Sequence, residues 1–199
     1  MRRIETTRFG LKEWRVVVEA LREGRQIILL RKGGIHEPRG EFKVAHREFF
    51  LIPGLEHQKK ELLKPEAVAS FASSFDSLTD GGPLRLDTFA QLVESIELRD
   101  PSLAHRLGDH HVWNEAYVQL RIDYKPETPL YLLLLRVFAL PTAIEIPRLE
   151  RYAGCRSWVE LDEELSTEGK RAVLEDEHFD ARLRAVKSAI GPAKAPSPR

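Results

Sequence analysis

Residues Gln26–Gln58 read QIILLRKGGIHEPRGEFKVAHREFFLIPGLEHQ, and the rest of the chain is arranged around them. Two apolar runs, Ile27–Leu30 and Phe49–Ile52, flank a segment that is dense in charged and polar side chains. Short apolar runs bounded by glycine and proline are typical of buried strands. This stretch therefore predicts two core strands with ionisable side chains concentrated between them.

The size and composition of the chain indicate one globular domain. Its 199 residues are 42% hydrophobic and 31% charged, which is enough to bury a core without disulfides. The single cysteine, Cys155, excludes an intramolecular disulfide and a cysteine-based zinc cage. The apolar runs are too short to span a membrane and the N-terminus has no signal peptide, so we expect a cytoplasmic protein with no membrane partner.

The net charge is zero, but the charges are unevenly distributed along the chain. Residues 1–64 contain 15 Lys/Arg and 9 Asp/Glu, whereas residues 65–199 contain 16 and 22. A surplus of cations in the first part suits contact with phosphate groups. An ordinary solvated surface is the alternative interpretation.

The hydrophobic patterns predict an α+β fold, with a mixed, mostly antiparallel sheet and flanking helices in a single domain. Strands are expected at residues 26–31, 42–52, 84–98, 130–140 and 157–161. Helices are expected at residues 11–23, 65–78, 101–107 and 113–120, and from Asp176 onward. We expect residues 1–9 to be a flexible N-terminus, 10–190 to be the domain, and 191–199 to be a disordered tail.

The first candidate binding element consists of Arg31, Lys32, Gly33 and Gly34. Two cations at a strand end, followed by glycines that let the backbone approach a ligand, suit a phosphate group. The sequence contains neither a Walker motif nor G-x-G-x-x-G, so a nucleotide-binding fingerprint is absent. A hairpin loop with solvated cations is the alternative.

The candidate catalytic residues are Glu48, His46, Glu56 and His57. Side chains two apart on a strand point to the same side, and a second Glu-His pair after a turn could converge on the first. Such a set could bind a divalent metal or supply an acid and a base. The alternative is a structural cluster of ion pairs with Lys43 and Arg47.

Three further residues are candidate ligand contacts: Arg47, Gln58 and Arg136. Arg136 interrupts an apolar strand, where an unpaired cation is costly, so we expect it to pair with Glu48 or Glu160. The other polar candidates are expected to be structural, with Cys155 as a buried packing residue and His105, His110 and His111 as surface or cap residues.

Several short motifs together resemble the DUF1802 family of uncharacterised prokaryotic proteins. In the first half these are Leu11–Trp14, Arg31–Ile35, His46–Phe49 and Glu56–Gln58. In the second half they are Trp113, Arg121, Leu133–Val137, Tyr152–Cys155 and Ser157–Leu161. The resemblance covers roughly residues 10–180 and implies no mechanism, cofactor or metal.

The sequence favours a protein that binds a phosphate-bearing ligand or nucleic acid through the polar segment Arg31–Gln58. A metal-dependent hydrolase or nuclease that uses Glu41, Glu48, Glu56 and the neighbouring histidines is the rival class. Glu41-x-Lys43 is also similar to an element of PD-(D/E)XK nucleases, although this spacing is common by chance. A protein-interaction module without chemistry is the third. Neither a cofactor nor a protein partner is identified by any motif.

Overall fold

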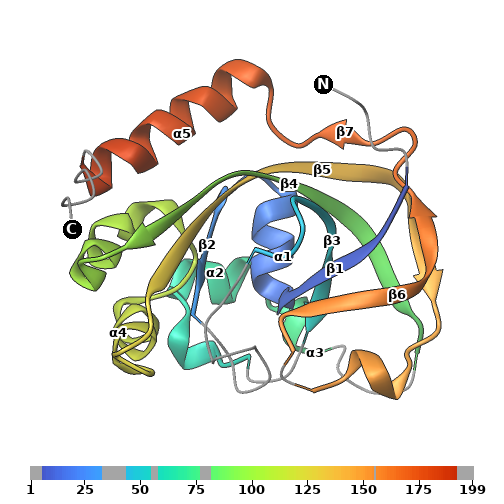
Figure 1. The fold of residues 1–199 in the computed structure, drawn as a ribbon, viewed down its shortest axis with the longest axis horizontal. Helices are drawn as coiled ribbons and strands as arrows, with labels where there is room; N and C mark the ends of the chain where they lie inside the picture. Colours follow the sequence, from blue (N-terminus) through green and yellow to red (C-terminus); the bar gives the residue numbers. More distant parts are fainter. Residues whose placement is uncertain (1–5, 33–43, 55–57, 77–81, 155, 192–199) are drawn as a thin grey trace, which may run out of the picture.

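The structure, a computed structural model, describes residues 6–32, 44–54, 58–76, 82–154 and 156–191. It confirms the α+β class, because a seven-stranded, mostly antiparallel sheet and its helices form one domain (Figure 1). The strands are β1 (Thr6–Trp14), β2 (Ile28–Arg31), β3 (Glu48–Gly54), β4 (Leu84–Leu98), β5 (Leu130–Ile146), β6 (Trp158–Ser166) and β7 (Arg171–Ala172). The α-helices are α1 (Arg15–Arg22), α2 (Pro65–Ser70), α3 (Ser73–Asp76), α4 (Glu115–Asp123) and α5 (Asp176–Ile190). The 3-10 helices are η2 (Lys60–Leu62), η3 (Pro101–His110) and η4 (Glu150–Tyr152).

The sheet has the strand order β2-β5-β4-β3-β1-β6, and β7 pairs with β5. Strands β1 and β3 are parallel, and the other pairs are antiparallel. Figure 1 shows the sheet curving around α1, which contacts β1, β3 and β5. Strand β1 ends at Trp14 and α1 begins at Arg15, so this junction lies next to the concave side of the sheet.

Strand β3 is buried on both faces and separates two hydrophobic cores. Phe49 and Leu51 belong to the larger core, which includes the buried face of α1. Phe50 and Ile52 belong to the smaller core, which includes Tyr152 and residues of β4 and β6. This alternation follows from the two-residue period of a strand.

The predicted helix at residues 11–23 is wrong in its first part, where the structure has β1. Leu11 and Trp14 fit helical spacing, but pairing with β3 and β6 holds residues 6–14 in a strand. Gly10 permits this pairing, because a Cβ there would lie 2.3 Å from Cδ1 of Ile52. Gly24 has the expected role after the helix, with φ of +68°.

Three other predicted boundaries differ in the structure. Pro141 does not end a strand, because β5 continues to Ile146 and an irregularity opposite it, between Leu86 and Thr88, accommodates the proline. The strand expected at 42–52 begins only at Glu48 among the described residues. The helix expected at 65–78 is interrupted by a turn at Phe71 and Ala72.

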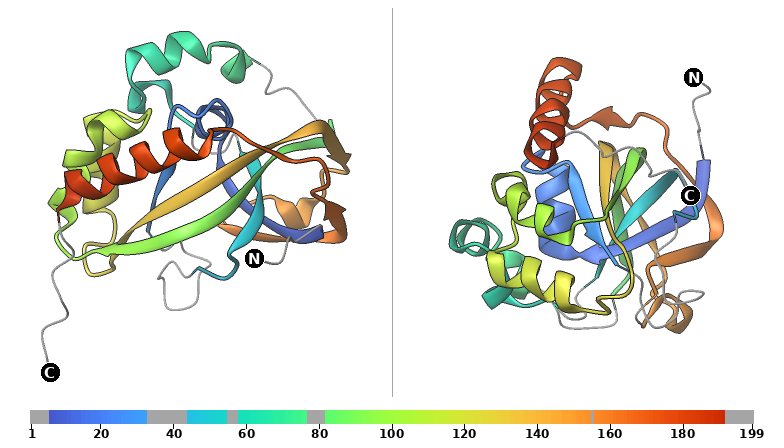
Figure 2. Two further views of the ribbon diagram at one scale, coloured as in Figure 1. Left: turned by 90° about the horizontal axis from the view of Figure 1, so that it is seen from above. Right: turned by 60° about the vertical axis from the view of Figure 1, so that its left-hand side comes forward.

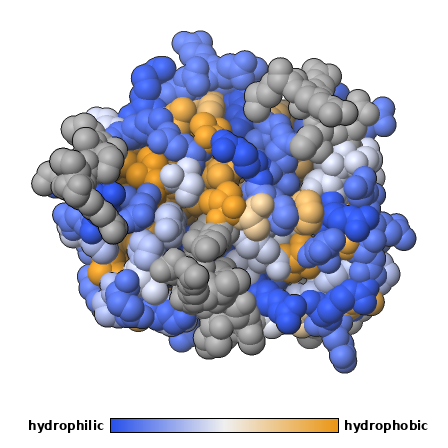
Figure 3. All heavy atoms as spheres, in the orientation of Figure 1, coloured by the Kyte–Doolittle hydropathy of each residue, from blue (hydrophilic) through white to orange (hydrophobic). Residues whose placement is uncertain are grey.

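The C-terminal helix α5 begins at Asp176, as predicted, although the N-cap position is occupied by Glu175. It packs against η3 at one end of the molecule (Figure 2). Hydrophilic side chains cover much of the face shown in Figure 3, with hydrophobic ones gathered near its middle. No helix in the described ranges is both long and apolar enough to cross a membrane.

Candidate functional site

His46 and Glu48 lie in different surroundings, because residue 47 is a bend that precedes β3. The His46 ring stacks on Phe9, with ring centroids 3.4 Å apart, and meets the edge of Trp158. Burial lowers the pKa of His46, since the charged form would lose its hydration. Glu48 instead accepts a hydrogen bond from Nε2 of Gln91 at 2.7 Å. Their expected partners Glu56 and His57 lie outside the described residues, as do Glu41 and Lys43.

Arg47 has a structural position beside an irregular part of β4. Its Nη2 donates to the carbonyl oxygens of Leu92 and Val93 at 3.4 and 3.5 Å. The register of β4 with β5 shifts between Leu92 and Glu94, and the Arg47 carbonyl accepts from the Leu92 amide. Arg47 therefore forms hydrogen bonds with backbone groups of β4 at the position where its register with β5 shifts.

Arg31 crosses from β2 to the end of β1. Its Nη1 donates to Oε2 of Glu13 at 3.0 Å and to the Lys12 carbonyl at 3.2 Å. The side chains of Arg31 and Glu13 are only 10% and 3% exposed. Oε1 of Glu13 also accepts from the Trp14 amide at 2.8 Å. This buried ion pair fastens β2 to the β1–α1 junction, a contact that sequence spacing did not indicate.

Lys32 and Gln58 lie near the same end of the sheet, whereas Gly33 and Gly34 fall outside the described residues. Nζ of Lys32 donates to the Ile122 carbonyl at 2.9 Å, and burial lowers the pKa of this amine. Oε1 of Gln58 accepts from the Val16 amide at the start of α1. These predicted ligand residues thus bind the protein's own backbone.

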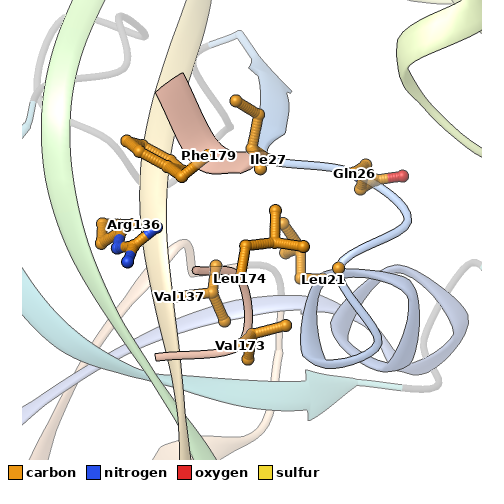
Figure 4. A pocket seen from close by; sticks show the side chains of 9 residues that line it. Leu21, Gln26, Ile27, Arg136, Val137, Val173, Leu174 and Phe179 are labelled. Atoms are coloured by element: carbon orange, nitrogen blue, oxygen red, sulfur yellow. The ribbon is translucent and has the colours of Figure 1, made fainter. Parts of the chain in front are cut away.

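The predicted ligand residue Arg136 lies under α5, with its side chain toward Phe179 (Figure 4). It pairs with Asp176 at 2.6 Å, so the expectation of Glu48 or Glu160 was wrong. Arg136, Gln26 and several apolar side chains line a cavity of only about 10 Å³, roughly the room one water needs. Arg136 therefore anchors the start of α5 to the sheet.

Two aromatic residues after η3 form a buried stack that was not predicted from the sequence, although Trp113 belongs to the motifs of the family resemblance. Trp113 and Tyr117 lie with ring centroids 4.8 Å apart and planes 5° from parallel. The Tyr117 hydroxyl accepts from Nε of Arg121 at 3.0 Å, and burial raises the pKa of Tyr117. Because both rings are almost fully buried, they serve as core and not as a surface for stacking bases.

His111 is the C-cap residue of η3, which is one of the two predicted positions, and it is buried and not on the surface. Its side chain contacts the Trp113 carbonyl through Nδ1 at 3.2 Å. Burial, and then the charge of Lys64, lower the pKa of His111 to about 4. The ring is therefore neutral at pH 7, and a metal or catalytic role has no support from its surroundings.

A cavity of about 590 Å³ lies beside α1, away from most of the predicted site residues. This volume lies within the range of small-molecule sites. Its lining residues are Arg15, Val18, Glu19, Arg22, Glu23, Pro53, Ser70, Phe71, Ser73, Gly82, Pro83, Leu84, Arg85, Asp87 and Arg148. They come from α1, the end of β3, the α2–α3 region, the start of β4 and the segment after β5. We call this space the α1 cavity.

Three arginines of the α1 cavity already have carboxylate partners, in the pairs Arg15–Glu19, Arg22–Asp87 and Arg85–Glu145. Glu19 also accepts from the Ser74 hydroxyl. The fourth, Arg148, donates from Nε to the Gly82 carbonyl at 3.2 Å. Within the described ranges Arg148 forms no ion pair, so its terminal nitrogens can donate to a ligand. No signal in the sequence marked it, because its neighbours come from distant segments.

The described residues contain no group of three His, Cys, Asp or Glu side chains that could hold a metal ion. Most of the residues invoked for a metal-dependent hydrolase fall outside those ranges. The hydrolase class therefore stays a prediction from the sequence.

Comparisons with known proteins agree with the resemblance seen in the sequence. A family model described as "Domain of unknown function (DUF1802)" matches residues 10–185. Among solved structures, ASCH from Zymomonas mobilis matches with a TM-score of 0.43 and 13% identity over 89% of this chain and 93% of ASCH. A mutant of the same protein gives a TM-score of 0.41 and 14% identity over 92% and 99%. At these values the similarity identifies no shared function. No curated protein matches the chain significantly.

Proposed function

Because the chain belongs to the DUF1802 family, whose description names no activity, we propose its function from its own residues: it binds a phosphate-bearing ligand in the α1 cavity. Arg148 is the residue that contacts the phosphate. One observation carries this proposal. Arg148 is exposed, lines a cavity of about 590 Å³, and forms no ion pair with any residue that the structure describes.

The chemistry of the guanidinium group supports phosphate as the anion. Arginine presents a planar set of donors that binds two phosphate oxygens at once. The Gly82 carbonyl holds Nε of Arg148 and leaves the two terminal nitrogens to donate. Ser70 and Ser73 also line this cavity.

The acidic residues of the cavity do not cancel this charge. Glu19 and Asp87 are held by Arg15 and Arg22, and Glu23 pairs with Arg25 at 2.8 Å. Each carboxylate therefore has its own cation, and Arg148 supplies the remaining positive charge.

Nucleic acid is the second candidate ligand, and the surplus of cations in residues 1–64 favours it. The predicted contacts Arg31 and Lys32 hold Glu13 and the Ile122 carbonyl, so they would have to exchange these partners to bind phosphate. Titration with an oligonucleotide at several salt concentrations separates the two ligand classes. A protein that contacts many phosphates loses affinity for the oligonucleotide steeply as the salt concentration rises.

Replacing Arg148 by alanine is expected to weaken phosphate binding by about ten- to a hundredfold, since a hydrogen bond to a charged group contributes about 1.5–3 kcal/mol. Isothermal titration calorimetry with inorganic phosphate at low salt measures this change. Arg184→Ala removes an equivalent exposed charge on α5 and serves as the control. Equal affinity in the two variants, or no phosphate binding by the unmodified protein, would contradict the proposed function.

A further inference from the structure

A second cavity, of about 250 Å³, adjoins the α1 cavity. The two cavities share Pro53, Leu84 and Arg148. The remaining lining residues of the second cavity are Lys12, Ile52, Gly54, Leu149, Tyr152 and Ala153. We call this space the Tyr152 cavity. Arg148 thus stands at the junction of the two spaces.

The Tyr152 cavity has a different chemistry from the α1 cavity. Ile52, Leu84 and Tyr152 belong to the smaller hydrophobic core, and Leu149 packs against it. The polar end of Tyr152 is already engaged, because its hydroxyl accepts from the Asp162 amide at 3.1 Å. The ring of Tyr152 lines the cavity, although the residue is only 6% exposed and the Arg151 guanidinium lies 5.4 Å from the ring centroid.

Among the described lining residues of the Tyr152 cavity, Lys12 carries the only ammonium group, and its Nζ donates to the Gly154 carbonyl at 2.6 Å. This bond fixes the ammonium at a backbone carbonyl. The apolar lining residues therefore suit an apolar group, and Lys12 and Arg148 supply the cationic groups of the lining. An apolar group that enters such a space gains the free energy of leaving water.

We propose that the ligand is a phosphomonoester whose ester group is a flat apolar ring, with the phosphate at Arg148 and the ring in the Tyr152 cavity. This inference rests on the proposed function, because it assigns the other half of the same ligand. An aryl ring matches the ring of Tyr152 and the aliphatic side chains beside it. Together the two cavities have the polar and apolar division that is usual in small-molecule sites.

Calorimetry with phenyl phosphate, inorganic phosphate and phenol tests the division of the site. Phenyl phosphate is expected to bind at least about tenfold more tightly than inorganic phosphate, because the ring adds apolar burial. Phenol alone is expected to bind weakly, since it lacks the anion. Arg148→Ala should weaken both phosphate compounds.

The substitution Ala153→Phe fills the Tyr152 cavity from a residue that is exposed, so the core is not disturbed. It should weaken the binding of phenyl phosphate more than that of inorganic phosphate, because the ring loses its space. Ala181→Phe, at an exposed position of α5, is the matched control. Ala153→Leu repeats the test with a smaller side chain, in case the phenylalanine variant fails to fold.

Different failures separate the two proposals. If inorganic phosphate binds through Arg148 but phenyl phosphate binds no more tightly, the ring inference is overturned and the proposed function stands. If Ala153→Phe and Ala181→Phe give the same affinity for phenyl phosphate, the ring does not occupy the Tyr152 cavity. If no phosphate compound binds, both proposals are overturned.

Discussion

Replacing Glu13 by glutamine is expected to lower the free energy of unfolding by about 3–5 kcal/mol, because it breaks a buried ion pair. The Glu13 carboxylate accepts from Arg31 at 3.0 Å and from the Trp14 amide at 2.8 Å, and its side chain is 3% exposed. Glutamine keeps the shape of the side chain but removes the charge that balances Arg31. Equilibrium unfolding in urea measures the loss.

The exposed pair Arg85–Glu145 provides the control, since its side chains are 69% and 54% exposed. Glu145→Gln should cost only about 0–1 kcal/mol. The double variant Glu13→Leu with Arg31→Met should recover part of the loss, because apolar residues can replace a buried pair. If Glu13→Gln were as mild as the control, Arg31 would not be mainly structural, and its predicted role as a ligand contact would gain support.

Stability is expected to fall by about 3 kcal/mol as the pH drops from 7 to 4 on account of His111 alone. Its pKa in the folded protein is about 4, compared with 6.5 ordinarily, because burial and Lys64 disfavour the charged form. Between these values the unfolded chain binds a proton that the folded protein does not, so unfolding becomes easier. Below pH 4 both forms are protonated and the effect ends.

His111→Gln should flatten this part of the pH profile, measured by thermal or urea unfolding at several pH values. The lowered pKa values of His110 and His46, which also arise from burial, leave a smaller slope in the same direction. His178→Gln, at an exposed position of α5, should leave the whole slope in place. A profile of His111→Gln that paralleled the unmodified protein would show that His111 is accessible to protons.

The sheet could be predicted in outline because its longest strands carry their own patterns. Strand β5 contains a long apolar run, which is typical of a central strand buried on both faces. Strand β4 was predicted because it lies between two turns, although its apolar residues also fit helical spacing. Strand β1 could not be predicted, since its residues satisfy helical spacing and only the neighbouring β3 and β6 decide otherwise. Pairing between distant segments is information that local periodicity lacks.

The candidate site was harder to predict than the fold, for a related reason. The sequence showed that Arg136 needed an acidic partner, but its partner Asp176, and the pairing of Arg31 with Glu13, were decided by the tertiary arrangement. Arg148 carried no local signal, because Gly82 and the α1 cavity reach it only through folding. Arg31 and Arg136, which the sequence marked as ligand contacts, therefore proved to be members of ion pairs within the protein. The residue that we propose as the ligand contact had no such mark.

The most direct measurement is a crystal structure of the protein with phenyl phosphate. Our proposals predict the phosphate within hydrogen-bonding distance of the terminal nitrogens of Arg148, and the ring between Leu149 and Tyr152. Phosphate density beside Arg31 and Lys32, or an empty site around Arg148 at a concentration where calorimetry shows binding, would contradict them.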